Sequence, residues 1–257
     1  MPAPAQLEFP APPRRPFSGP TGPLEQIGLA AICLRTCLAL YLGILLGRAR
    51  LDMPAFAAAL RQAGLSILPA ITLVTAAVGV ILGNQTAALL MRFDLPQLIL
   101  TTIADTVLME LLPILVGILV AGRAGVALAV RQAGLVASGE MDGLLVNGIN
   151  PIQFTVGPTL LAMLLMSFAF VVWGTLVTFT SAILWLWGVG GIPPTLFLDA
   201  VRQALTPADL LEALVKPQMF ALLIALIATV NGTMAGRDAE GAARAATRTM
   251  IGAVTAI

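Results

Sequence analysis

The chain has 257 residues, 58% of them hydrophobic and 11% charged, and its formal net charge is +1. This composition excludes an ordinary soluble domain, because uncharged runs as long as residues 143–198 are typical of integral membrane proteins. The small net charge offers no basic surface for nucleic acid, and the absence of histidine removes the commonest metal ligand and general base. We therefore expect neither a metal site nor a nucleic-acid partner.

The N-terminal region is rich in proline. Residues 1–23 contain eight of the 18 prolines, so they cannot build a packed core and are predicted to be disordered. They also lack the apolar run of a signal peptide.

Residues 24–60 form the next region, and its run from Leu24 to Gly47 is apolar but carries Glu25 and Arg35. A transmembrane helix is one interpretation of this run. A helix that lies in or dips into the cytoplasmic leaflet fits its arginines, and those that follow it, better. Two cysteines four residues apart, Cys33 and Cys37, are interpreted as small hydrophobic residues of this helix.

Four later segments are long and apolar enough to cross a bilayer. They run from Leu65 to Leu90, from Leu98 to Val130, from Pro158 to Trp187 and from Leu214 to Met234. The second of them exceeds the roughly 20 residues that a span needs, so its first part is predicted to form an extra turn or short helix on the outer side.

The C-terminal region after these segments is charged. Residues 237–248 carry five charged side chains and are predicted to form a return loop. The stretch from Thr249 to Ile257 is too short to cross, so we expect the last span of this chain to be shortened.

The arginines predict the orientation, because cytoplasmic segments carry an excess of Lys and Arg. With a cytoplasmic N-terminus, the cytoplasmic side holds Arg14, Arg15, Arg35, Arg48, Arg50, Arg61, Arg123, Arg131, Arg237, Arg244 and Arg248. The other side holds Arg92, Arg202 and Lys216. This asymmetry predicts a multi-pass protein whose N-terminus and the helix after Val130 are cytoplasmic.

A stripe of small residues marks the central span. Pro113, Gly117, Ala121, Gly125 and Ala129 recur every four residues and therefore share one face of a helix. In lipid, such a stripe lets another helix approach closely. We predict that Gly117, Ala121 and Gly125 pack against a neighbouring helix.

Glu110 lies in the same span. A carboxylate inside a span costs about 2.5–3.5 kcal/mol on insertion scales, so it usually faces a cavity or a partner. Arg123 lies about 20 Å farther along the helix and cannot be that partner. Glu110 therefore either lies at the outer interface or lines a polar cavity there, with Gln85 and Phe93 at similar depth. On the cavity interpretation, the substrate-binding residues are Gln85, Phe93, Glu110 and Leu111.

A short polar helix is predicted directly after this span. Ser138 can cap its start, and Glu140 and Asp142 in the first turn complement the helix dipole. The pairs Asn147-Gly148 and Asn150-Pro151 are typical of a helix end. The segment is either a plain connector or a surface that receives force from a soluble motor.

Four groups of residues together resemble the MlaE-type permeases, which are ABC-transporter membrane subunits that work with MCE-domain proteins to move lipids. They read E-L-L-P and A-G-R-A-G (110–113, 121–125), S-G-E-M-D-G-L and N-G-I-N-P (138–144, 147–151), S-I-L-P (66–69) followed by Gln85, and V-N-G and R-A-A-T-R-T (230–232, 244–249). The similarity extends from about residue 60 to the end, which identifies residues 61–257 as the permease domain.

The resemblance implies a permease in the bacterial inner membrane that moves a phospholipid or a similar amphiphile between this membrane and an MCE-domain partner. No nucleotide-binding motif occurs in the chain, so ATP would be bound by a separate ABC ATPase subunit and the permease itself would need no cofactor. The implied partners are that ATPase, a periplasmic MCE-domain protein and a second permease, in a homodimer or pseudo-dimer. The implied ATPase-coupling residues are Gly134, Ser138, Glu140, Met141, Asp142 and Leu144.

Four positions depart from the family pattern. The family commonly has an arginine at Met109, acids at Arg131 and Gly139, and an arginine at Thr159. The changes in the motor-facing helix alter the usual ATPase contacts, and they favour a divergent branch or one half of an unlike permease pair.

We therefore predict an all-α polytopic membrane protein. It would have about five transmembrane helices, an N-terminal interfacial helix and a cytoplasmic coupling helix. The alternative function is a non-transporting scaffold that anchors partner subunits in the membrane. An intramembrane enzyme is disfavoured, because the chain has no histidine and no paired catalytic constellation.

Overall fold

The computed structural model describes residues 22–47, 52–93, 95–204 and 206–257, and every regular element in these ranges is a helix. Segments labelled η are single π-helical turns. The elements in chain order are α1 (Pro23–Leu45), α2 (Met53–Leu60), η1 (Arg61–Leu65), α3 (Leu68–Leu90), α4 (Pro96–Thr106), η2 (Val107–Leu111), α5 (Leu112–Val120), η3 (Ala121–Gly125), α6 (Val126–Ser138), α7 (Glu140–Val146), η4 (Ile152–Val156), α8 (Gly157–Gly188), α9 (Pro194–Ala204), α10 (Pro207–Thr233) and α11 (Ala239–Ala256). Most of the N-terminal segment predicted to be disordered, and two of the arginines after α1, lie outside the described residues.

The chain is a polytopic all-α membrane protein, as predicted. Five described segments are long and apolar enough to cross a membrane: Leu24–Leu45, Met53–Leu90, Pro96–Ser138, Ile152–Gly188 and Ala208–Thr233. The last four contain the four predicted spans, except that the last predicted span ends at Met234, one residue beyond Thr233. Most of these segments exceed the roughly 20 residues that a bilayer core needs, so they continue beyond it.

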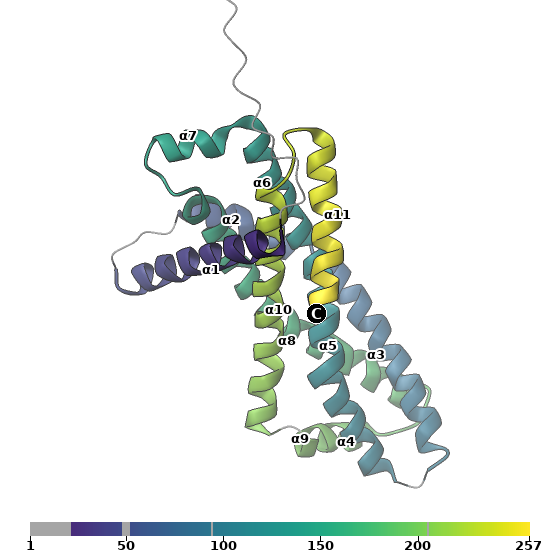
Figure 1. Cartoon of the computed structure of the whole chain (residues 1–257). Coiled ribbons are helices and arrows are strands. Elements are labelled where there is room, and N and C mark those ends of the chain that lie inside the picture. Colours follow the sequence, from purple (N-terminus) through teal and green to yellow (C-terminus); the bar gives the residue numbers. More distant parts are fainter. Residues whose placement is uncertain (1–21, 48–51, 94, 205) are drawn as a thin grey trace, which may run out of the picture.

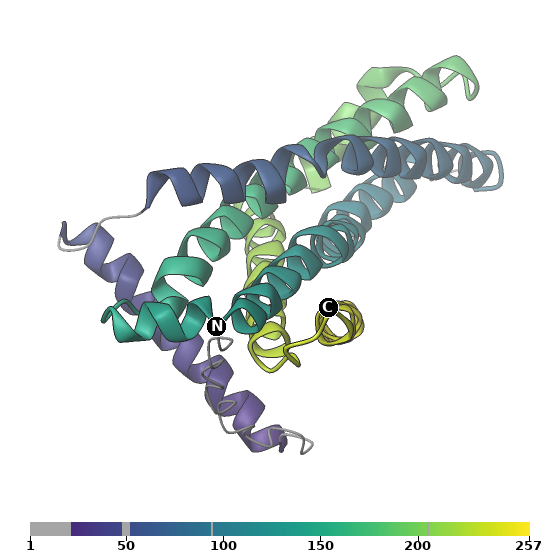
Figure 2. The same ribbon diagram turned by 90° about the horizontal axis from the view of Figure 1, so that it is seen from above.

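Helix α1 lies across the bundle rather than along it. In Figure 1 it crosses α10 near that helix's upper end, and in Figure 2 it is seen along its length while α11 is seen nearly end-on. Its inner face buries Cys33 and Cys37 in the main core, and the Tyr41 hydroxyl donates a 2.8 Å hydrogen bond to the Gly157 carbonyl. Because α1 is also long and apolar enough to span, the choice between an interfacial and a spanning helix stays a prediction.

Different elements form the two ends of the bundle. Figure 1 shows α7 and the turn between α10 and α11 at one end, and α4 and α9 at the other. At the second end Phe179 and Phe197 pack edge to face, and Gln97 donates a 2.9 Å hydrogen bond to Gln203. The short helix predicted at the start of the central apolar segment is α4, which continues through η2 into α5.

Close backbone contacts join α10 to the segment from α5 to α6. A methyl group at Gly232 would lie 2.6 Å from the Ala129 carbonyl oxygen and 2.6 Å from Gln132 Cβ. At Gly125 a methyl group would lie 2.6 Å from Ile224 Cγ2. Since only glycine leaves this space, α10 meets the backbone of α6 directly at Gly232, and the Ile224 side chain packs on the backbone at Gly125.

The predicted return loop over residues 237–248 is wrong. Helix α11 already begins at Ala239, and the Asp238 carboxylate caps it by accepting a 3.1 Å hydrogen bond from the Gly241 N–H. The alanine-rich sequence favours a helix strongly enough to outweigh its charges, which lie on the exposed side. The helix then returns into the bundle, where Thr249 and Ala253 are fully buried.

Candidate functional site

Glu110 lies in the π-helical turn η2, between α4 and α5. Pro113 has no N–H, so it cannot donate to the Met109 carbonyl one turn earlier. In the structure the Lys216 ammonium group donates to this oxygen instead, at 3.1 Å. Such π turns frequently accompany functional sites, because they leave backbone groups available to side chains or ligands.

Lys216 is the centre of a charged cluster that joins η2 to α10. Its Nζ lies 3.6 Å from Glu110 Oε1 and 2.9 Å from Glu212 Oε1. The Lys216 side chain is 31% exposed, whereas those of Glu110 and Glu212 are 66% and 59% exposed. The cluster therefore presents two accessible carboxylates around a half-shielded cation.

Sequence reasoning missed Lys216 as the partner of Glu110. The two residues are 106 positions apart, and spacing along one helix cannot pair them. The available signal was Lys216-Pro217 inside an otherwise apolar span, because a cation and a helix-interrupting proline are both uncommon there.

Two of the predicted substrate-binding residues come from α3 and the turn after it. Gln85 is exposed on α3, and Phe93, 56% exposed, follows that helix. Leu82, one turn before Gln85, packs on the cluster that contains Val107 and Leu108, so α3 and η2 are neighbours at this depth. No contact among the described residues joins Gln85 or Phe93 to Glu110, and the shared substrate site stays a prediction. Leu111, also predicted there, is half-buried at the end of η2.

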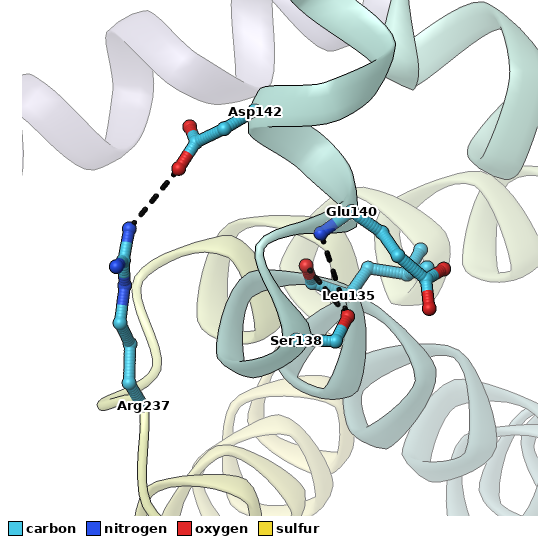
Figure 3. A network of polar contacts seen from close by, with 5 residues as sticks. All are labelled: Leu135, Ser138, Glu140, Asp142 and Arg237. Carbon is cyan, nitrogen blue, oxygen red and sulfur yellow. Dashed lines mark hydrogen bonds and ion pairs between the residues drawn. The ribbon is translucent and has the colours of Figure 1, made fainter. Parts of the chain in front are cut away.

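The predicted coupling helix is α7, but its cap differs from the prediction. Ser138 is the last residue of α6, and the N-cap of α7 is Gly139, whose φ of 75° lies in the left-handed region. The Ser138 hydroxyl lies 3.5 Å from the Glu140 N–H, too far for a strong cap (Figure 3). Glycine is preferred here because the chain turns sharply between two helices.

The other end of α7 follows the predicted pattern. Gly148 has φ 72°, its N–H donates to the Leu145 carbonyl at 3.0 Å, and the Ile149 N–H donates to the Leu144 carbonyl at 2.9 Å. These two bonds define a Schellman motif. The Asn150 side chain then accepts a 3.0 Å hydrogen bond from Ile152 at the start of the next helix.

One ion pair ties α7 to the turn before α11. Arg237 Nη2 lies 3.2 Å from Asp142 Oδ2, and both side chains are about two-thirds exposed (Figure 3). Leu145 and Val146 are 61% and 88% exposed on the same short helix. The remaining predicted coupling residues are exposed or half-buried: Gly134, Glu140, Met141 and Leu144. Residues of α7 thus form an exposed surface with apolar and acidic side chains.

The small-residue stripe packs against helices of the same chain. A methyl group at Gly117 would lie 3.1 Å from Ile257 and 3.3 Å from Phe220, and Gly125 faces Ile224. Ala121 is fully buried in the same core. Within the described residues, no group of three or more Asp, Glu or Cys side chains is placed to hold a metal ion.

Comparisons with known proteins agree on one family. The model of the family described as Permease MlaE matches residues 56–257. A probable ABC transporter permease protein of Rickettsia prowazekii is 27% identical over 190 residues, 73% of each chain. The intermembrane phospholipid transport system permease protein MlaE of Haemophilus influenzae is 26% identical over 68% of this chain and 67% of its own. The chloroplastic protein trigalactosyldiacylglycerol 1 of Arabidopsis thaliana is 32% identical over 55% of this chain and 41% of its own.

Proposed function

The chain belongs to the MlaE permease family, and we propose that it is the membrane subunit of an ABC transporter that moves a phospholipid or a similar amphiphile. The observation that carries the proposal is the charged cluster of Glu110, Lys216 and Glu212, which lies within segments apolar enough to span a membrane. Charged groups at such positions are costly and usually mark a transport pathway.

A phospholipid matches the chemistry of this cluster. The Lys216 ammonium group can exchange its carboxylate partners for a headgroup phosphate, while Glu110 can accept hydrogen bonds from headgroup donors. Leu111 and Phe93 would contact the first acyl carbons, and Gln85 would add a further polar contact. This combination of few polar groups with apolar walls is typical of sites for amphiphilic ligands.

Helix α7 is the proposed contact with a separate ATPase subunit, which would bind and hydrolyse ATP. Its exposed Leu145 and Val146 could enter a groove of that subunit, and Asp142 lies at the edge of the same surface. Gly134, Ser138, Glu140, Met141 and Leu144 would complete the contact. The α7 end would then be cytoplasmic, as the arginine asymmetry predicts.

The remaining partners follow from the family resemblance. A periplasmic MCE-domain protein would exchange lipid with the permease at the end that carries α4 and α9. A second permease, identical or related, would complete a dimer in the bacterial inner membrane. The name of one relative, an intermembrane phospholipid transport system permease protein, supports phospholipid as the substrate class.

Lipid transfer by the purified complex tests the proposal. Replacing the carboxylate in Glu110→Ala removes a charged hydrogen-bonding group, so transfer should fall about tenfold or more at equal complex assembly. The measurement is the transfer of labelled phospholipid between vesicles that contain the complex and acceptor vesicles, with and without ATP.

Glu212→Ala is the matched control, because it removes the other carboxylate partner of Lys216. If lipid transfer falls more in Glu110→Ala than in Glu212→Ala, then the role in transfer belongs to Glu110 in η2. Wild-type assembly without transfer would contradict transport and favour the scaffold alternative, whereas ATP-independent transfer would contradict only the dependence on an ATPase subunit.

A further inference from the structure

A buried hydrogen bond joins the two helical segments that flank α7. Gln132 Nε2 in α6 donates to Thr155 Oγ1 in η4 at 2.9 Å, and the two residues are 0% and 2% exposed. The Thr155 hydroxyl itself donates to the Pro151 carbonyl at 2.8 Å, so its oxygen must accept from the Gln132 amide. Two linked bonds therefore run from α6 to Pro151, the N-cap of η4.

The Gln132 side chain is held in place at a cost to stability. It belongs to a segment apolar enough to cross a membrane, and its Oε1 accepts no hydrogen bond from the described residues. On its other side α10 packs so closely that a methyl group at Gly232 would lie 2.6 Å from Gln132 Cβ. A buried amide that is only partly hydrogen-bonded is less favourable than an apolar side chain of similar size. Stability alone therefore does not account for a glutamine here.

The two flanks of α7 pack on different helices. Helix α6 packs mainly on α10 and α11, whereas η4 packs mainly on α1 and α8. Packing alone would therefore attach the two flanks to different parts of the bundle. The hydrogen bond between Gln132 and Thr155 connects the flanks directly.

The joints between α7 and its flanks are free of packed side chains. Gly139 and Gly148 have φ of 75° and 72°, and a methyl group at either position would meet no atom within 4 Å. Backbone rotation at such glycines costs little. A displacement of α7 would therefore move one flank and leave the other behind, unless the two flanks are tied.

We propose that Gln132 is a positioning residue that ties α6 to η4, so that α6 and α8 move together when an ATPase subunit displaces α7. This inference rests on the proposed function of α7 as the ATPase contact. Because Gln132 is fully buried, it touches neither the ATPase nor the lipid and acts through the helices that it joins. Single changes in networks that couple two sites alter the coupling by about 2- to 30-fold.

The number of phospholipids transferred per ATP hydrolysed by the purified complex tests the tie. Gln132→Leu should lower this ratio about fivefold, while the ATPase co-purifies as with the wild type because the α7 surface is unchanged. Thr155→Val should lower the ratio as well, whereas Thr155→Ser keeps the hydroxyl and should restore it. Thr159→Val is the matched control, because this buried hydroxyl, one turn later, donates within its own helix at 3.1 Å.

Amide hydrogen exchange measures the tie without ATP hydrolysis. Loss of one ordinary hydrogen bond in Gln132→Leu should make the amides of residues 147–156 exchange about fivefold faster. Thr159→Val should exchange like the wild type. The same purified complex serves for both measurements.

Three results would overturn the proposal. Unchanged exchange in Gln132→Leu would show that the bond does not hold the flanks together. Faster exchange with an unchanged ratio of transfer to ATP hydrolysis would make the bond structural only. Loss of the ATPase from Gln132→Leu would assign the effect to the α7 surface. Absence of ATP-driven transfer by the wild type would instead overturn the proposed function, and the exchange measurement would still decide whether Gln132 ties the two segments.

Discussion

Two ion pairs connect the segment from η2 to α7 with α10 and the turn after it, and they lie at opposite ends of that segment. Glu110–Lys216 links η2 to α10, and Asp142–Arg237 links α7 to the turn after α10, at 3.6 Å and 3.2 Å. Their environments differ more than their distances. Among the described residues, half-shielded Lys216 has three oxygen partners, whereas both members of the second pair are about two-thirds exposed and have one partner each.

The comparison teaches that the distance between the charged atoms does not by itself determine how much each ion pair contributes to stability. A solvent-exposed pair contributes about 0–1 kcal/mol, because water screens it and ordering two long side chains costs entropy. A shielded cation with several oxygen partners leaves uncompensated charges when it is removed, and that loss is larger. The first pair should therefore stabilise the fold, and the second should matter mainly for the surface that α7 presents.

The largest loss of stability should come from a change that moves α10 away from α6. In Gly232→Ala the new methyl group would contact the Ala129 carbonyl at 2.6 Å, so α10 must move away from α6. We expect a loss of about 2–3 kcal/mol of stability, at the upper end for overpacking. Thermal unfolding in detergent measures it. Gly28→Ala, inside α1 and with nothing within 4 Å, should unfold no more easily than the wild type, because alanine favours a helix over glycine. A Gly232→Ala protein as stable as the wild type would contradict the close contact.

A smaller effect is expected at the shielded cluster. Lys216→Met keeps most of the side-chain volume but leaves two carboxylates and the Met109 carbonyl without their cation, which should cost about 0.5–1 kcal/mol because both carboxylates stay accessible to water. The double variant Glu110→Gln/Lys216→Met removes one of the unpaired charges and should recover part of the loss. Chemical unfolding of the wild type, the single variants Glu110→Gln and Lys216→Met, and the double variant gives the coupling energy, and no difference between Lys216→Met and wild type would refute the shielded pair.

The smallest effect on stability is expected at the exposed pair. Asp142→Arg places two arginines opposite each other and should cost about 0.5 kcal/mol or less. Association with the ATPase subunit should nevertheless fall, because the change reverses a charge on the proposed contact surface. Co-purification of the ATPase measures this loss.

The charge swap Asp142→Arg/Arg237→Asp provides the control for that variant. It restores an ion pair within the chain but leaves the reversed charge on α7. If co-purification recovers in the swap, then Asp142 acts by holding α7 in place. Full co-purification in Asp142→Arg alone would show that α7 is only a connector.

Local sequence patterns determined the helical class, the four later spans and the end of α7. Apolar length predicts a span because a lipid-exposed backbone must satisfy its own hydrogen bonds. Asn147-Gly148 predicts the Schellman motif because glycine adopts the left-handed conformation at little cost. The orientation, the substrate residues and the α7 partner stay predictions, because they depend on molecules other than this chain.

Only the tertiary structure decided which distant side chains meet. It joined Lys216 to Glu110 and Gln132 to Thr155, and it placed Gly232 on α6. It also corrected the cap of α7 to Gly139 and the charged return loop to a helix. Such contacts depend on how separate helices cross, and the period of a single helix indicates which of its faces is packed but not which helix covers that face.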